Sequence, residues 1–214
     1  MNKSSLIFAM LLASFTFNTR AVGTYIGVDA SYTRYPEWGD RISSNAYASG
    51  ASYAITNEHS MGIGLGIRGG QWKNDNFGWE AGYDNLRSND GSTNILTGGN
   101  NGFGSFKYSA TAIHAAALGG VKFNKSTLFG KIGVHSHTTQ LNGVTVFGGS
   151  AYSKTASGTG LLLGIGYIST YTNKLSGRYA IDLFRGVVFT DILDFSQTTQ
   201  ENLVKFSYGL DYAF

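Results

Sequence analysis

The chain has 214 residues, a formal net charge of +3, one proline and no cysteine. This length fits one domain plus a short processed segment, and the lack of cysteine excludes a fold held together by disulfides. The basic residues are scattered singly, so we expect no nucleic-acid partner, because nucleic-acid-binding proteins gather Lys and Arg on one face.

Residues 1–21 are typical of a secretory signal peptide. Lys3 gives a positive start, an apolar run follows over 6–17, and small residues around Ala21 form a passable cleavage site. The apolar run is too short to span a membrane as a helix. We therefore expect Sec-type export and a single mature domain over residues 22–214.

After the signal segment, apolar residues alternate with small or polar ones, which is the period of a β-strand. The eight segments with this period are 24–34, 61–72, 76–86, 108–123, 126–138, 161–167, 175–183 and 206–214. The last segment, "FSYGLDYAF", places four aromatic rings and a leucine on one face. An unpaired apolar strand at the end of a chain invites aggregation, so this edge must be both paired and covered.

The connections between these segments alternate between short and long. Short turns are expected near 74–75, 124–125 and 172–173, and long polar loops over 36–59, 88–106, 140–156 and 190–201. This asymmetry is typical of membrane barrels. The sequence therefore predicts an all-β fold, an eight-stranded antiparallel up-and-down transmembrane β-barrel that pairs its last strand with its first. A soluble barrel with its apolar face inward is the alternative, but aromatics at strand ends favour the membrane form.

At this point the sequence resembles the OmpA-like eight-stranded outer-membrane barrels. "FGWEAGYDNL", "LSGRYAIDL" and "SYGLDYAF" are similar to the third, seventh and last strands of that family. The resemblance implies a cell outer-membrane location and a C-terminal signal for the barrel-assembly machinery, carried by Tyr208, Tyr212 and Phe214. The chain stops at the eighth strand, so we expect no cell-wall anchoring through a peptidoglycan-binding domain.

The alternation turns ten charged side chains toward the lumen. They are Asp29, Glu80, Asp84, Asp182, Asp211, Arg68, Lys122, Lys131, Arg178 and Lys205. Five acids and five bases in a narrow lumen predict a network of ion pairs, because an unpaired buried charge is costly. By the family resemblance, Glu80 and Arg178 would form an internal gate pair, with Arg68 as a competing partner across the 74–75 turn.

Three histidines, His114, His135 and His137, are expected on the same inner face. Three imidazoles are a weak candidate for a metal site. No Asp or Glu lies near them in sequence to orient the rings, so we interpret them as polar lumen side chains and expect no metal and no cofactor.

Two further motifs indicate no chemistry. The glycines over 64–69 match a dinucleotide fingerprint, but that fingerprint requires a helix after it, and here a strand runs into a turn. His135 and Ser136 are adjacent, so on a strand they point to opposite faces and cannot form a base–nucleophile pair. We expect no enzyme.

The sequence therefore predicts a non-enzymatic outer-membrane protein with a role in envelope integrity or surface contact and a plugged, gated lumen. A small ion-conducting porin is one alternative. A surface adhesin is another, because aromatic residues lie in the expected loops; they are Trp38, Tyr47, Phe103, Phe147 and Tyr152. Outer-membrane lipid and lipopolysaccharide are the expected surroundings, and we expect a monomer.

Overall fold

The computed structural model describes residues 23–35, 53–59, 61–97, 100–144, 151–190 and 197–214. The predicted signal segment, loop residues 36–52 and the loop aromatics Trp38, Tyr47 and Phe147 lie outside the described residues. These ranges contain nine strands, which are β1 Thr24–Arg34, β2 Tyr53–His59, β3 Met61–Trp72, β4 Phe77–Thr97, β5 Asn100–Phe123, β6 Ser126–Val144, β7 Ala151–Thr170, β8 Leu175–Thr190 and β9 Thr198–Ala213. Within the described ranges, no helix is long and apolar enough to cross a membrane.

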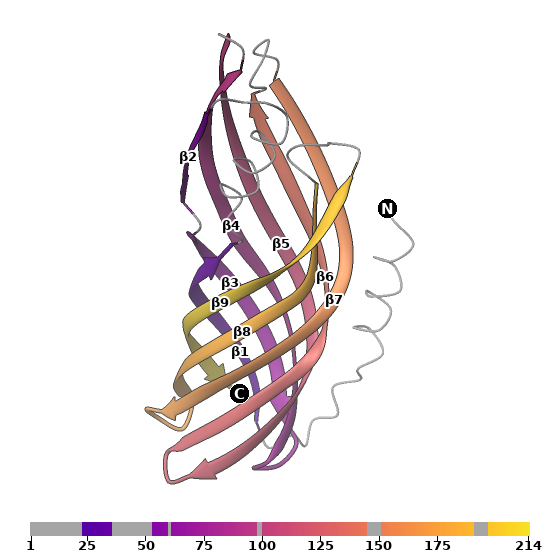
Figure 1. Cartoon of the computed structure of the whole chain (residues 1–214). Helices are drawn as coiled ribbons and strands as arrows, with labels where there is room; N and C mark the ends of the chain where they lie inside the picture. Colours follow the sequence, from indigo (N-terminus) through magenta and orange to yellow (C-terminus); the bar gives the residue numbers. More distant parts are fainter. Residues whose placement is uncertain (1–22, 36–52, 60, 98–99, 145–150, 191–196) are drawn as a thin grey trace.

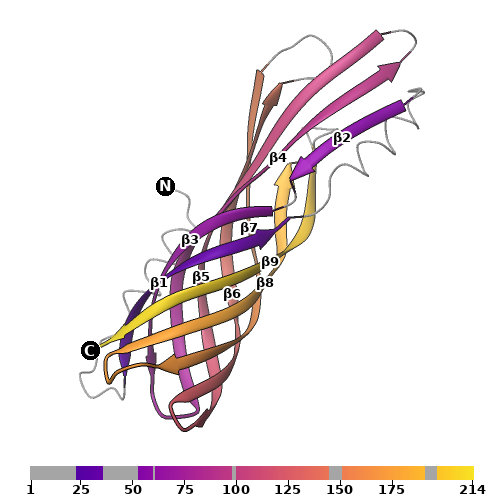
Figure 2. The ribbon, with the colours of Figure 1, turned by 90° about the vertical axis from the view of Figure 1, so that its left-hand side faces the viewer.

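Eight of the nine strands form a closed antiparallel ring (Figures 1 and 2). Around the ring the order is β3-β1-β9-β8-β7-β6-β5-β4, and β4 returns to β3. The last strand pairs with the first from Tyr25↔Ala213 to Arg34↔Val204, which leaves no apolar edge open there. The predicted eight-stranded barrel is therefore confirmed. The ninth strand, β2, lies outside the ring and pairs with residues 90–96 of β4.

The outer wall of the ring carries a band of exposed apolar side chains. On β3, for example, Ile63 and Leu65 are 63% and 69% exposed while Gly64 between them faces inward. On β6 the band ends at Val134, because the next outward residues are Ser136 and Thr138. A polar interior inside an apolar outer band identifies this wall as the membrane-facing surface.

The short turns occur where the sequence predicts them, at 73–76, 124–125 and 171–174. The expectation of long loops at the other end was wrong in part. Hairpin β4–β5 stays paired up to Thr97↔Asn100, and hairpin β6–β7 up to Val144↔Ala151. Above the membrane both faces of a hairpin meet water, so the alternation of apolar residues fades although the pairing continues. These extended hairpins project from one end of the barrel, which we call the upper end (Figure 2).

Candidate functional site

The centre of the lumen is the Glu80 carboxylate on β4, which is fully buried. It accepts a hydrogen bond of 2.5 Å from Arg178 on β8 and one of 2.8 Å from the Tyr25 hydroxyl on β1. Lys131 on β6 donates a third, at 3.3 Å. The two residues of the predicted gate pair are thus in direct contact. Tyr25 was missed from the sequence, because it lies at the start of a strand whose other inward residues are small or acidic.

A second part of the network joins the two ends of the chain. Arg68 on β3 bonds Asp29 on β1 at 2.6 Å and Asp211 on β9 at 2.7 Å. Its distance to Glu80 is 4.0 Å, so Arg68 is at most a peripheral partner of the gate pair. Lys205 on β9 contacts Asp84, and lies 3.0 Å from Asp29. The charges on β1 and β9 are therefore held by side chains on β3 and β4.

The remaining predicted lumen charges lie at two places. Asp182 on β8 pairs with Lys131 at 2.9 Å inside the lumen. Lys122 was wrongly assigned to the lumen. It lies at the end of β5 near the short turns, where its side chain is exposed and pairs with Asp75 at 3.0 Å. The buried layer therefore holds five acids and four bases.

Inward glycines make room for these side chains. A Cβ on Gly66 would lie 2.7 Å from Asp29 and 2.9 Å from Asp84, and one on Gly27 would lie 2.0 Å from Asp211. Gly66, one of the glycines that match a dinucleotide fingerprint, thus allows close packing of charged groups inside a strand.

His114 on β5 completes the charged layer. Its Nδ1 lies 3.0 Å from Asp84 and its Nε2 lies 3.6 Å from Glu80. The expectation that no carboxylate orients the histidines was therefore wrong for His114. Both carboxylates come from β4, which is distant in sequence and adjacent in the ring. Among the described residues, no group of three or more metal-ligating side chains has the arrangement of a metal site.

His135 and His137 lie one layer higher on β6, with Nδ1 atoms 3.3 Å apart. His135 is opposite His114 in the strand register. Both rings are buried, whereas Ser136 between them belongs to the outer face. The base–nucleophile pair that the sequence argued against is thus not formed by these adjacent residues.

Two apolar clusters lie above and below the charged layer. The upper one fills the lumen beneath the extended hairpins, and its largest fully buried side chains are Tyr35, Leu86, Tyr108, Leu141, Leu162, Phe184, Phe189 and Leu203. The lower one contains Leu118, Phe129, Ile168 and Ala180, packed against Trp72. The upper cluster was not predicted from the sequence. Along β8, Gly186 interrupts the alternation and shifts Val187 and Phe189 to the inner face, where a strict period of two would not place them.

At the short-turn end, a polar vestibule of about 280 Å³ opens toward the lumen. Tyr25 and Asp211 lie at its inner limit, and Asp75 and Lys122 lie at its rim. Tyr25 and Asp211 are each 6% exposed and Glu80 is 1% exposed. Access from this end therefore narrows sharply at the charged layer.

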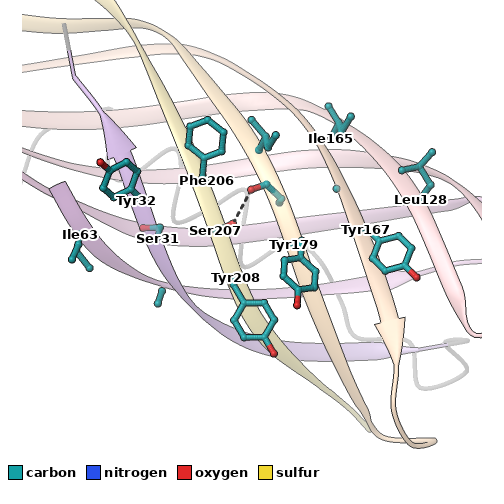
Figure 3. Close-up of a pocket in the computed structure, with 14 residues that line it drawn as sticks. Ser31, Tyr32, Ile63, Leu128, Ile165, Tyr167, Tyr179, Phe206, Ser207 and Tyr208 are labelled. Atoms are coloured by element: carbon teal, nitrogen blue, oxygen red, sulfur yellow. Dashed lines mark hydrogen bonds between the residues drawn. The ribbon is translucent and has the colours of Figure 1, made fainter. Parts of the chain in front are cut away.

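Two shallow grooves on the outer wall are larger than this vestibule. One of about 680 Å³ runs across β1, β9, β8 and β7 (Figure 3). Figure 3 shows Tyr32, Phe206, Tyr208, Tyr179 and Tyr167 along its length. The rings of Tyr179 and Tyr208 lie 4.7 Å apart between their centroids. This surface belongs to the apolar band.

The residues of the expected assembly signal also lie on the outer wall. Tyr208 and Tyr212 face outward on β9, and Phe214 is 77% exposed at the end of the chain. The Phe214 backbone N–H bonds Thr24 at 3.0 Å, and its ring contacts Tyr212 edge-on. The terminal ring is thus presented on the outside of the closing seam between β9 and β1.

The comparison with solved structures identifies the fold. The chain is similar to the outer-membrane protein OprG from Pseudomonas aeruginosa, with a TM-score of 0.50 and 14% identity over 91% of this chain and 97% of that chain. It is also similar to Ail, the attachment invasion locus protein of Yersinia pestis, with a TM-score of 0.47 and 14% identity over 90% and 98%. Neisserial surface protein A is similar as well, with a TM-score of 0.48 and 12% identity over 89% of this chain and 97% of that chain.

No protein-family model matches the chain, and no curated protein matches it. The likeness to OprG, together with the closed ring and its apolar band, confirms the fold of an outer-membrane β-barrel, as the resemblance to the OmpA-like barrels predicts.

Proposed function

We propose that this protein is a non-enzymatic resident of the outer membrane whose plugged lumen makes the barrel a stable wall element of the envelope. The upper apolar cluster carries this proposal. Leu86, Phe184 and Phe189 are completely buried above the charged layer. An ion leaving that layer upward would have to cross packed apolar side chains, which is costly for a charge. The paired lumen charges then act as internal crosslinks between strands.

The test is ion conductance of the refolded protein in planar bilayers, wild type beside Glu80→Ala. We expect both proteins to be silent, since removing Glu80 leaves the apolar clusters in place. Insertion is checked on the same bilayers by the protection of the strands from added protease. Discrete current steps in wild type would contradict the plug, and steps that appear or lengthen only in Glu80→Ala would establish instead a pore gated by the Glu80–Arg178 pair.

Surface contact is a second candidate function. It is favoured by the continuation of hairpins β4–β5 and β6–β7 beyond the apolar band, with β2 added along β4. A stiff sheet held clear of the membrane is a suitable platform for contact with another surface.

Two partners follow from the proposed location. Outer-membrane lipid and lipopolysaccharide would cover the apolar band, with acyl chains in the shallow groove of Figure 3. The barrel-assembly machinery would bind the last strand through Phe214, whose ring is the most exposed of the described large apolar side chains. We propose that the protein works as a monomer, because the ring is closed without a second copy.

A further inference from the structure

The upper end of β8 leaves the barrel wall. Pairing of β7 with β8 ends at Leu161↔Arg185, and the register of β8 on β9 shifts before Val187↔Glu201. Gly186 lies between, with a φ of 78°, in the left-handed region that favours glycine. Residues 187–190, which we call the β8 lid, are therefore bonded to β9 but no longer to β7.

The lid forms part of the upper plug. Val187 and Phe189 are completely buried in the upper apolar cluster. Phe189 meets the ring of Tyr108 edge-on at 5.5 Å between centroids, and the Tyr108 hydroxyl donates a 2.7 Å hydrogen bond to the Thr190 carbonyl. Moving the lid would therefore open the plug.

Side chains of β6 hold the lid by its backbone. The Val188 N–H donates a 2.8 Å hydrogen bond to His137 Nε2, and Thr139 Oγ1 donates a 2.7 Å bond to the Val188 carbonyl. On β7, Gly158 leaves the space for this approach, since a Cβ there would lie 2.8 Å from the Val188 side chain. Two β6 side chains thus replace the pairing that β7 no longer supplies.

A second histidine holds β8 on the other side of the bulge. His135 Nε2 lies 3.2 Å from the Arg185 carbonyl, and His135 Nδ1 lies 3.3 Å from His137 Nδ1. The two rings therefore form one bridge, which runs from Arg185 to Val188 around Gly186.

Only one set of protons satisfies every bond in this bridge. His137 Nε2 accepts from a backbone N–H, so it carries no proton, and the proton of neutral His137 lies on Nδ1. That Nδ1–H donates to His135 Nδ1, and the proton of neutral His135 therefore lies on Nε2, where it donates to the Arg185 carbonyl. A further proton on His137 would set N–H against the Val188 N–H. A further proton on His135 would set N–H against His137.

The charged groups around the bridge do not supply a substitute acceptor. On β5 the facing group is His114, whose own nitrogens point to Asp84 and Glu80 on β4. On β7 the facing residues are Gly158 and Gly160. On β8 they are the Arg185 and Val188 backbone and the Phe184 ring, 5.2 Å from His135 between centroids. On β6 itself the next inward residues are Thr139 and Gly133, and Lys131 follows Gly133.

We propose that the His135–His137 pair is an acid-sensitive latch, which holds the β8 lid over the lumen at neutral pH and releases it when His137 is protonated. Its residues lie above the apolar band, where the lumen mouth faces the outside of the membrane. Release would expose Val187 and Phe189 to water.

The pKa of His137, which lies beyond the apolar band, agrees with this geometry. Burial, and then the neighbouring His135 ring, lower the pKa of His137 to about 4. The closed latch therefore favours neutral His137, whereas a released imidazole has a pKa of about 6.5. The stability that the latch gives is complete above pH 6.5 and is lost as the pH falls from there toward 4.

The experiment uses Val187→Cys as a reporter in a chain that has no other cysteine. The refolded protein in lipid vesicles is labelled with a membrane-impermeant maleimide between pH 7.5 and pH 5. Thr155→Cys, exposed on β7, corrects for the pH dependence of the reagent. We expect the labelling rate of Val187→Cys relative to Thr155→Cys to rise about 30-fold over this range, as the loss of one proton-linked contact predicts.

Two added substitutions separate the latch from other titrating groups. His137→Gln keeps an acceptor for the Val188 N–H and does not titrate, so the rise should disappear. His114→Gln is the matched control, because it removes a lumen histidine that does not bond the lid, and the rise should remain. A flat ratio in the unsubstituted background overturns the proposal without any histidine variant. A rise that survives His137→Gln, or that vanishes in His114→Gln, also overturns it.

Discussion

Glu80 illustrates how single residues stabilise this barrel. Its carboxylate is shared by Arg178, Lys131 and Tyr25, which come from three other strands. Replacing one member of a buried ionic group leaves its partners uncompensated in a medium of low dielectric constant. Exposed ion pairs lack this effect, because water screens them.

Glu80→Gln is therefore expected to lower the free energy of unfolding by about 3–5 kcal/mol, because Arg178 and Lys131 lose their shared anion. The measurement is urea unfolding of the refolded barrel in lipid vesicles. Asp75→Asn is the matched control, since it breaks an exposed acid–base pair with Lys122 at the rim and should cost at most about 1 kcal/mol. Equal losses in the two variants would show that the lumen network does not stabilise the barrel.

The inward direction of these charges could be predicted from the sequence, but their pairing could not. Period two places Glu80 and Arg178 on the inner face, whereas their distance depends on the stagger of strands around the closed ring. Lys122 obeys the same period yet lies outside the lumen, because it is near the end of its strand. The hydrogen bond between His137 and Val188 depends on the bulge at Gly186, which alternation alone does not locate.

At the scale of strands, the membrane segments and the projecting hairpins follow different rules. β1 and β3 have the bounds that the sequence predicts, because one of their faces meets lipid and the other the lumen. The upper parts of β4 and β5 have no such contrast, so their sequence resembles a loop. Backbone pairing nevertheless continues through Ser92↔Ser105 and beyond.

The projecting tip of hairpin β4–β5 can be removed to test the surface-contact candidate. Replacing residues 92–105 with Asn-Gly, which forms a tight hairpin turn, retains the pairs from Phe77↔Gly119 to Gly91↔Phe106. We expect the barrel to fold and cell attachment to fall. Attachment of expressing cells to a host-cell layer is the measurement. Cutting hairpin β6–β7 at Asn142↔Ser153 in the same way is the control for the choice of hairpin. Full attachment by both shortened proteins would contradict a surface role.

At the scale of the whole molecule, Phe214 contributes to the closed barrel and has a separate proposed role in its assembly. Phe214 contributes one backbone bond to the closing seam, and its ring is largely exposed. Its removal should thus affect the finished barrel little. If the assembly machinery binds this ring, the effect will appear only in cells.

Phe214→Ala is accordingly expected to refold in detergent as wild type does, and to accumulate in the outer membrane at less than about half the wild-type amount. The comparison is Phe77→Ala, which removes another outward aromatic ring, 51% exposed, near the same end of the barrel. Immunoblots of membrane fractions give the amounts. Equal accumulation of the two variants would argue against a terminal assembly signal.

The network that joins β1, β3, β4 and β9 is complete only in the closed barrel. Arg68 finds Asp211, and Asp84 finds Lys205, only when the final strand arrives. Without that strand Arg68 retains Asp29 but lacks Asp211, and Asp84 lacks Lys205. The pairing of β9 with β1 that closes the barrel therefore also pairs Asp211 with Arg68 and Lys205 with Asp84. A shift of the last strand by one residue would turn Lys205 and Asp211 away from the lumen, so the lumen pairs favour the native register of closure.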